Sequence, residues 1–278
     1  MLGQEICRTA PSWATLVALT RADGDLSEEA GAAAALGGTQ ADVVVHCAAY
    51  TNVDGATEDP EAARRGNVLA TRNVAGICRD LGAQLIHIST DYVFDGTSDR
   101  PCVESTPPSP INVYGETKLA AEHEAAEVRR HLIVRTQWLF GPGRRNFIEA
   151  ILGAARAGKS LKVVQNEYGH PTYTPDLALG IWRLIETSAD GIVHLTNSGV
   201  CSRLEFAQAA LTEADLGDTE IVGIDSDEWP SPTRRPLHAV LDSERLEELG
   251  IAPLRQWGEA LRDYVAILRE RWRHEDGA

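Results

Sequence analysis

Tyr114 and Lys118 stand four residues apart in the segment Tyr114-Gly115-Glu116-Thr117-Lys118. If this segment is helical, the two side chains lie on one face, and the ammonium reaches up beside the phenol. A cation there favours the phenolate, and a phenol with an unperturbed pKa of about 10 needs such a neighbour to act as an acid or base near neutrality. The hydroxyl of Thr90, at the end of an apolar run, could hold the substrate oxygen that the tyrosine protonates. These three residues predict carbonyl reduction.

The segments that must position these side chains decide how the pair is interpreted. A tyrosine and a lysine four apart are, by themselves, more often a surface pair on an amphipathic helix. Here Leu85-Ile86-His87-Ile88 has the pattern of a buried strand that ends in Ser89-Thr90-Asp91, and Asn112-Val113 leads into the helix. With its longer motifs the chain resembles the extended short-chain dehydrogenase/reductases and, within them, the dTDP-4-dehydrorhamnose reductases. The motifs are CAAYTNVD at 47–54, STDYVFDG at 89–96, NVYGETKLAAE at 112–122 and RRPLHAVLD at 234–242.

The resemblance implies an α/β fold, a Rossmann-like doubly wound parallel sheet with a smaller C-terminal substrate-binding lobe. We expect residues 1–142 to form the NAD(P)-binding domain and residues 143–278 to form mainly the substrate-binding lobe, with some segments returning to the main sheet. Apolar runs predict strands of this sheet at 16–20, 42–47, 85–88, 131–136 and 192–196. Helices are predicted at 27–40 and 57–80, and the tail 243–271 is predicted to form two amphipathic helices with a packing stripe of Trp257, Leu261 and Tyr264.

The beginning of the chain departs from this pattern. A dinucleotide-binding fold opens with a short strand, a glycine-rich turn and a helix whose N-terminus meets the pyrophosphate. This chain begins Met1-Leu2-Gly3-Gln4, so by resemblance Gly3 corresponds to the third glycine of the turn, and about ten residues are expected to be absent. Three explanations stay open. We favour a misplaced start or a truncated chain; the others are a different strand in the same place and a chain that is functionally impaired.

The cofactor site still predicts a preference between the nicotinamide cofactors. The predicted second strand ends at Thr20-Arg21, where an NAD-binding protein typically places an acidic residue on the ribose hydroxyls. A cation suits a 2′-phosphate, so we expect NADPH, with NADH left open; a solvated loop position is the alternative for Arg21. The resemblance further implies cofactor contacts by Gly3, Asp25, Leu26, Ala48, Ala49, Tyr50, Asn67, Ser89, Tyr114 and Lys118. Asn67 is expected to shape the active-site helix or, alternatively, to be an ordinary polar helix residue.

For the substrate, the resemblance implies a nucleotide sugar held by Val53, Thr90, Tyr92, Trp138, Arg234 and Arg235. The indole of Trp138 would stack on the deoxysugar, although a lone tryptophan near a strand end is more often part of the core. Arg234 and Arg235 lie in a proline-rich loop of an acidic protein, and two guanidinium groups suit a diphosphate; a surface pair is the alternative. The expected reaction is NADPH-dependent reduction of the C4 keto group of a dTDP-4-keto-6-deoxyhexose, with Thr90, Tyr114 and Lys118 as catalytic residues.

Composition limits the other classes of function. A net charge of −15 and a pI near 4.9 argue against binding to nucleic acid or to an anionic membrane. The apolar runs are all far shorter than the roughly 18 residues of a membrane span, and we expect a cytoplasmic protein. The five cysteines are scattered without C-x-x-C or paired-histidine spacing, so we expect reduced, mostly buried thiols and no metal site. His46 and His87 lie in strand-like runs and are interpreted as satisfied core histidines.

Two other functions stay open at this stage. The same fold can serve as a non-catalytic binding or regulatory subunit, since fold does not fix function. The absent glycine turn favours that alternative, whereas the intact set of Thr90, Tyr114 and Lys118 disfavours it. The second alternative is a reductase or epimerase of another nucleotide sugar. A homodimer is also left open.

Overall fold

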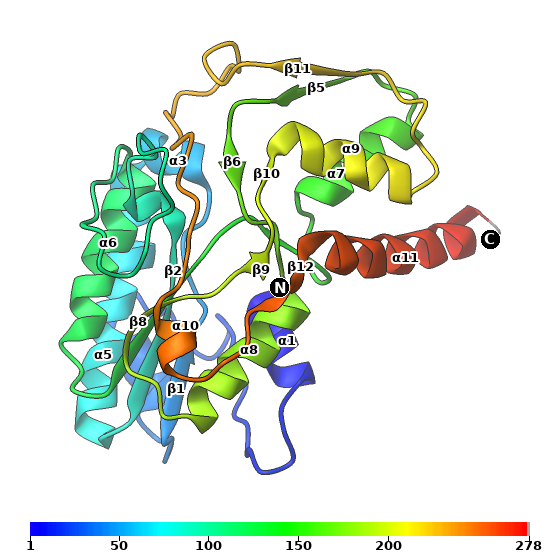
Figure 1. Ribbon diagram of the computed structural model, residues 1–278. Coiled ribbons are helices and arrows are strands. Elements are labelled where there is room, and N and C mark those ends of the chain that lie inside the picture. Colours follow the sequence, from blue (N-terminus) through cyan, green and yellow to red (C-terminus); the bar gives the residue numbers. More distant parts are fainter. Residues whose placement is uncertain (277–278) are drawn as a thin grey trace.

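A four-stranded parallel sheet forms the centre of the larger lobe (Figure 1). The computed structural model describes residues 1–276. The strands are β1 (Val43–His46), β2 (Gln84–Thr90), β3 (His131–Thr136) and β8 (Gly191–His194); they lie in that order, and every pairing is parallel. The predicted α/β class with a Rossmann-like parallel sheet is confirmed. The strands predicted at 42–47, 85–88, 131–136 and 192–196 are all present, with ends within two residues of the prediction.

The two faces of this sheet are buried in two different hydrophobic cores. Leu85 and Ile86 are neighbours on β2, yet Leu85 belongs to one core and Ile86 to the other. Successive side chains of a strand point to opposite faces, so a strand covered on both sides is apolar throughout. One face is covered by α2 (Glu29–Leu36), α5 (Ala70–Leu81) and α6 (Val113–Ala126), and the other by α1 (Leu2–Arg8) and α8 (Thr174–Glu186) (Figure 1).

Residues 16–20, predicted as the second strand, form no strand. Leu16, Val17 and Leu19 are 40%, 65% and 40% exposed, and the segment pairs with no other strand within residues 1–276. The backbone groups of a strand need a partner strand, and β1 pairs with β2 alone in the described sheet. The prediction was wrong because an apolar run becomes a strand only where a neighbouring strand completes its hydrogen bonds. The helix predicted at 27–40 is likewise shorter, since α2 ends at Leu36 before two glycines.

The long helix predicted at 57–80 is instead a series of shorter helices. α3 (Val53–Glu58) ends at Asp59, and α4 (Pro60–Arg64) begins there, with the amide of Ala62 donating to Asp59 Oδ1 at 3.0 Å. Proline cannot continue a helix, because it lacks an N–H, but it suits the first position of a new one. A π-helical turn, Arg65–Leu69, then leads into α5. The prediction missed this break, which matters because the π turn carries Asn67.

A second lobe is built around another hydrophobic core. It contains α7 (Phe147–Arg156), α9 (Arg203–Glu213) and α11 (Trp257–Asp276) (Figure 1). Leu261 and Tyr264 are buried in this core and Trp257 packs against it, so the predicted stripe is confirmed. The tail also holds the single turn α10 (Arg245–Glu248) before α11. Short strand pairs complete the lobe: β5 (Leu161–Val164) with β11 (Ile221–Ile224), β6 (Tyr168–Gly169) with β10 (Cys201–Ser202), β4 (Leu139–Phe140) with β7 (Thr172–Tyr173), and β9 (Asn197–Ser198) with β12 (Leu254–Gln256).

Between these elements the chain returns to the larger lobe, because α8 and β8 pack on and pair with the main sheet. The boundary at residue 142 stays a prediction. Cys78, Cys102 and Cys201 are buried, Cys7 is exposed, Cys47 is half-buried, and all five are free, as expected for mostly buried thiols. Within residues 1–276, no helix has the length and apolar character needed to cross a membrane.

Candidate active site

Tyr114 and Lys118 lie on the first turns of α6, and the sequence fixes where that helix begins. Asn112 caps it, with Oδ1 accepting from the Gly115 amide at 2.9 Å. A Cβ at Gly115 would lie only 2.1 Å from the carbonyl oxygen of Tyr92, so only glycine allows this helix to approach the segment after β2. Both candidate side chains are buried: Tyr114 is 9% exposed and Lys118 is 2% exposed.

Thr90 and Tyr114 are brought together, as the sequence predicts. β2 ends at Thr90, and the short turn Asp91–Val93 follows it. The Thr90 hydroxyl donates to Asp91 Oδ1 at 3.0 Å and lies near enough to the Tyr114 phenol to influence its pKa. The rings of Tyr92 and Tyr114 meet edge to face, with centroids 5.2 Å apart. Burial raises the pKa of Tyr114 well above its usual value, and the nearby Thr90 hydroxyl opposes that shift. The phenol therefore keeps its proton at neutral pH.

Lys118 does not act on Tyr114 in the way expected from their spacing. Its Nζ donates to the carbonyl oxygen of Ile88 at 2.7 Å and lies 3.2 Å from Nε2 of His87. Burial lowers the pKa of Lys118 to about 8, with the charge of Glu122 opposing that shift. The groups that influence the pKa of Tyr114 do not include this ammonium. The expectation that Lys118 lowers the pKa of Tyr114 is therefore wrong for this arrangement, because the ammonium is directed at β2.

His46 and His87 are core histidines, as predicted, but they are not fully satisfied. Each leaves one ring nitrogen, Nε2 of His46 and Nδ1 of His87, without a hydrogen-bond partner among the described residues. Their rings lie side by side on β1 and β2, with centroids 5.6 Å apart. Burial lowers the pKa of both, to about 3 for His46, so both imidazoles are neutral at pH 7.

Ser89, whose contact with the cofactor stays a prediction, is part of a buried network behind α6. Its hydroxyl donates to Glu122 Oε1 at 2.5 Å, and it is 4% exposed. Arg135 on β3 holds the same carboxylate with two hydrogen bonds, from Nε at 2.9 Å and from Nη2 at 2.7 Å. A buried carboxylate needs such partners, since an unpaired charge in the interior is costly. The Ser89 hydroxyl is therefore occupied in fixing α6 to the sheet.

Asn67 joins the loop after β1 to the active-site helix. Its Oδ1 accepts from the Tyr50 amide at 2.8 Å, and its Nδ2 donates to Thr117 Oγ1 at 3.0 Å. The hydroxyl of Thr117 in turn donates to the Tyr114 carbonyl oxygen. Asn67 is 1% exposed and its amide is used within the protein. These bonds agree with a residue that shapes the active-site helix, as the resemblance implied, and its contact with a cofactor stays a prediction.

The other residues predicted to contact the cofactor lie between α1 and the loop that follows β1. Gly3 lies inside α1, where an added Cβ would be an ordinary 3.7 Å from Cys47 Cβ, so it serves helix-to-strand packing and is not part of a turn. Arg21 is exposed and pairs with Asp25 at 3.2 Å. Leu26 packs on the core beneath α5. Ala48 is exposed directly after β1, and Ala49 is half-buried.

These residues suit the nicotinamide end of a dinucleotide cofactor better than its pyrophosphate end. An ammonium has three donors, and Lys118 uses two of them on described groups, which leaves one for a ribose hydroxyl. The small residues after β1 allow a ligand to approach the backbone there. At the pyrophosphate end, however, no strand with a glycine-rich turn precedes α1 within residues 1–276. The residues present thus suit the nicotinamide end of the cofactor.

On the substrate side, Val53, Tyr92 and Tyr114 share one apolar cluster, as their predicted roles require. Trp138 follows β3 with a positive φ of 48°, a backbone conformation that is uncommon outside glycine and concentrates at functional sites. Its indole packs against the core of the second lobe. The guanidinium carbon of Arg203 lies 3.6 Å from the ring centroid, so one face of the indole is covered within the protein. A stacked sugar could use only the other face.

Sequence reasoning missed three charged residues in this region. Arg203 Nε lies 3.6 Å from Glu167 Oε2. Asp91 is 3% exposed, accepts from Gln137 Nε2 at 3.1 Å, and has a pKa raised to about 6 by burial. Asp91 stands inside the motif STDYVFDG, directly after Thr90, so its place in that motif was the available signal. Nothing in the local pattern around Arg203 or Glu167 pointed to this site.

Arg234 and Arg235 do not present two free guanidinium groups. Arg235 donates to Asp54 Oδ1 at 3.0 Å and to Ser231 Oγ at 2.6 Å. Arg234 is exposed, and its backbone carbonyl accepts from Asn112 Nδ2 at 2.9 Å. Both arginines line a surface pocket of about 250 Å³. The joint grip on a diphosphate stays a prediction, in which Arg235 would use the N–H donors that Asp54 and Ser231 leave unoccupied.

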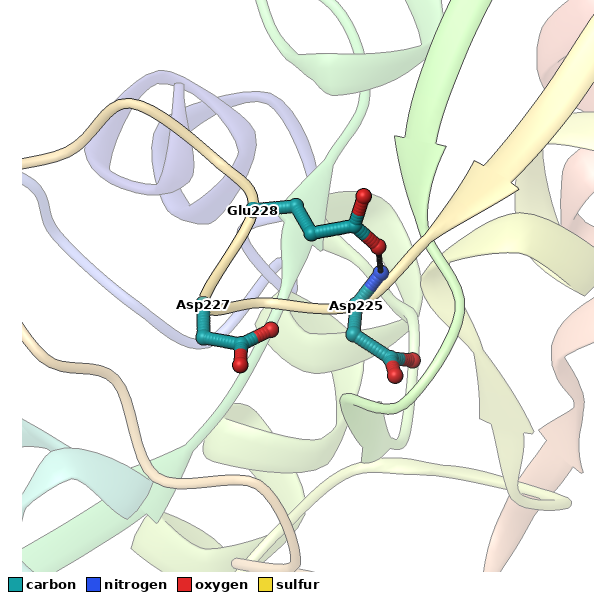
Figure 2. Close-up of side chains that lie close together, drawn as sticks. All are labelled: Asp225, Asp227 and Glu228. Atoms are coloured by element: carbon teal, nitrogen blue, oxygen red, sulfur yellow. Dashed lines mark hydrogen bonds between the residues drawn. The ribbon is translucent and has the colours of Figure 1, made fainter.

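An acidic cluster at the end of β11 gathers Asp225, Asp227 and Glu228 (Figure 2). All three side chains are exposed, and Glu228 Oε1 accepts from the Asp225 amide at 3.1 Å. The amide of Glu228 in turn donates to the Asp225 carbonyl oxygen, so the cluster closes a turn. Exposed carboxylates of this kind are accounted for by the turn that they stabilise.

Comparisons with known proteins place this arrangement among sugar-nucleotide enzymes. Residues 1–270 match the family described as RmlD substrate binding domain. The spore coat polysaccharide biosynthesis protein SpsK of Bacillus subtilis (strain 168) is 37% identical over 266 residues, covering 95% of this chain and 93% of that protein. The dTDP-4-dehydrorhamnose reductase of Mycolicibacterium smegmatis is 36% identical over 258 residues, covering 91% and 78%. A crystal structure of dTDP-4-dehydrorhamnose reductase from Bacillus anthracis in complex with NADP matches with a TM-score of 0.91 at 30% identity, covering 95% of this chain and 94% of that one.

Proposed function

The chain belongs to the dTDP-4-dehydrorhamnose reductase family, matched by its RmlD substrate binding domain, and from that premise we propose that it reduces the C4 keto group of a dTDP-4-keto-6-deoxyhexose with NADPH. It is an NAD(P)H-dependent oxidoreductase of the short-chain dehydrogenase/reductase type, placed in the biosynthesis of dTDP-L-rhamnose or a related deoxysugar. The observation that carries the proposal is that Thr90, at the end of β2, and Tyr114, on α6, are both buried and are brought together, with Lys118 one turn further along the same helix.

The residues divide the proton chemistry between them. When bound, NADPH supplies the hydride for C4. Tyr114 donates its phenolic proton to the carbonyl oxygen as that oxygen becomes an alkoxide. Burial raises the pKa of Tyr114, so the phenol is protonated at neutral pH before the reaction begins. Thr90 turns its hydroxyl from Asp91 to the same oxygen, donates to it and stabilises the developing charge. Lys118 uses its remaining donor to hold the nicotinamide ribose.

Substrate recognition falls to residues from both lobes. Val53 and Tyr92 supply apolar and aromatic surface around Tyr114. The open face of the Trp138 indole covers the deoxysugar, and the pocket lined by Arg234 and Arg235 takes the negatively charged nucleotide diphosphate. We further propose a cytoplasmic location, consistent with a substrate made from activated nucleotides, and a homodimer as the alternative to a monomer.

The preference for NADPH over NADH rests on Arg21. Its guanidinium is exposed and, among the described residues, pairs only with the half-buried Asp25, so it is free to turn toward a 2′-phosphate. Arg21→Ala should weaken NADPH binding several-fold and leave NADH binding unchanged. Equal loss for both cofactors would assign Arg21 to general charge or folding.

The test of the function is turnover of dTDP-4-keto-6-deoxyglucose and of its C5 epimer by the wild-type chain and Tyr114→Phe. Removal of the acid should lower kcat by at least about 10²-fold and leave the Kd for NADPH, followed by nicotinamide fluorescence, nearly unchanged. NADPH binding without turnover of any keto sugar by the wild type would favour a non-catalytic homologue. Turnover with another nucleotide sugar, or inversion at C5 or C4 without net reduction, would favour the other reductase or epimerase.

A further inference from the structure

We propose that His87 is a positioning residue that holds the ammonium of Lys118 in the active site by accepting a hydrogen bond at Nε2. The inference deepens the proposed function, on which it rests for its link to catalysis. Nζ of Lys118 lies 3.2 Å from His87 Nε2, and the two residues are 31 positions apart in the chain. The contact therefore exists only because β2 and α6 are packed together.

The chemistry of the two groups fixes which one donates. An ammonium carries donors only, so His87 must present a lone pair at Nε2 and carry its own proton at Nδ1. His87 is 1% exposed, and its pKa is lowered well below the usual value, first by burial and then by the nearby Lys118 charge. It is therefore a neutral acceptor at every pH at which the protein would work.

Lys118 is the one hydrogen-bond partner of the His87 side chain among the described residues. Nδ1 of His87 has none. Burying an imidazole costs free energy unless its polar atoms make hydrogen bonds. The hydrogen bond that Nε2 accepts from Lys118 is what accounts for the interior position of His87. Together with the Ile88 carbonyl at 2.7 Å, Nε2 fixes two of the three ammonium donors and directs the third away from β2.

The other groups around Lys118 do not replace this acceptor. His46 and Cys47, at the end of β1, are both neutral at pH 7, because burial lowers the pKa of His46 to about 3 and raises that of Cys47 to about 12. Glu122 on α6 attracts the ammonium, but its carboxylate is held by Arg135 and Ser89. His87 Nε2 and the Ile88 carbonyl, both neutral acceptors on β2, are thus the groups that hydrogen-bond the ammonium.

The chain offers a direct measurement that needs no cofactor and no substrate. It contains three lysines, and Lys159 and Lys162 are both exposed. Protein labelled with ¹³C at lysine Cε gives three signals, and an NMR titration assigns the one with a pKa near 8 to Lys118. We expect His87→Leu to lower that pKa by about one to two further units, because an ammonium loses the hydrogen bond that favours it.

Two variants separate the hydrogen bond from mere packing. His87→Gln places an acceptor oxygen near the position of Nε2 and should restore the wild-type pKa. His46→Leu is the matched control, since it removes a neighbouring buried imidazole that makes no hydrogen bond to Lys118. An unchanged Lys118 pKa in folded His87→Leu, or an equal fall in His87→Gln and His87→Leu, would overturn the proposal.

If His87→Leu does not fold, the wild-type protein still tests the direction of the hydrogen bond between Lys118 and His87. Its ¹⁵N imidazole spectrum, with His87 assigned by difference from His87→Gln, should show the Nδ1–H tautomer, and a protonated Nε2 would refute the proposed direction of the bond. In assays of turnover, His87→Leu should raise the KM for NADPH and shift the alkaline limb of kcat/KM to lower pH. If the wild type reduces no keto sugar, the proposed function fails, and the titration of Lys118 still tests the role of His87.

Discussion

The guanidinium of Arg203 stacks on the indole of Trp138, with its carbon 3.6 Å from the ring centroid, while its Nε lies 3.6 Å from the carboxylate of Glu167. The Glu167 side chain is only 8% exposed, and that of Arg203 is 19% exposed. One residue from α9 thus neutralises a nearly buried acid and covers one face of the tryptophan that stands at the end of β3. The arrangement ties the second lobe to the substrate side of the sheet.

Removing Arg203 should therefore destabilise the protein through the acid that it leaves behind. Arg203→Met is expected to lower the free energy of unfolding by about 2–3 kcal/mol, because the Glu167 carboxylate stays buried without its counter-ion. The double variant Arg203→Met with Glu167→Gln should recover at least half of that loss. Urea unfolding at pH 7 measures both, and strictly additive losses would show that the two side chains are not coupled.

The hydroxyl of Thr90 should matter for turnover more than its methyl group does. Thr90→Val removes the hydrogen bond to the reacting oxygen and should lower kcat by about 10²-fold, while Thr90→Ser keeps a hydroxyl and should stay within about tenfold of the wild type. The Kd for NADPH should change little in either variant. Steady-state kinetics with matched binding titrations checks this, and equal losses in the two variants would argue against the assigned role.

Asp91 should make stability depend on pH in the acidic range. Burial raises its pKa from 3.8 to about 6, so between about pH 4 and pH 6 the folded protein keeps a proton that the unfolded chain has lost. The free energy of unfolding contributed by this group must fall as the pH rises through that window. Asp91→Asn cannot ionise, so its stability relative to the wild type should rise by about 2–3 kcal/mol between pH 4 and pH 7. Parallel stability curves for the two proteins would contradict the buried carboxylate.

Asn67 should be among the most sensitive polar positions in the larger lobe. Asn67→Ala leaves the Tyr50 amide and the Thr117 hydroxyl without their partner, and we expect a loss of about 2–4 kcal/mol in the free energy of unfolding. Asn73→Ala on the adjoining α5 is the matched control; it removes one bond, to the Leu26 carbonyl at 2.9 Å, and should cost about 1 kcal/mol. Thermal or denaturant unfolding of both variants tests whether Asn67 is the link between β1 and α6.

The strongest sequence predictions were those that rest on local pattern. A short, nearly continuous apolar run, followed by a polar loop and a capped helix, is enough to place β2, Thr90 and the start of α6. Where the local pattern lacked its tertiary partner, the prediction was wrong. Residues 16–20 are apolar enough for a strand but have no neighbouring strand in the described sheet. Asp59-Pro60 is a sequence signal for a helix break, but the alanine-rich residues around it favoured the prediction of one continuous helix.

What the sequence determined by itself was the class of fold, through motifs that resemble a known family, and the positions along the chain of the predicted reacting groups. Tertiary structure alone decided which partner each charged side chain takes. Lys118 finds His87 31 positions away, and Arg235 finds Asp54 181 positions away, although both had been predicted to serve nearer or external groups. A buried charge takes the partner that the packing brings within hydrogen-bond distance, and that distance is set by strand register and helix placement, which no local pattern encodes.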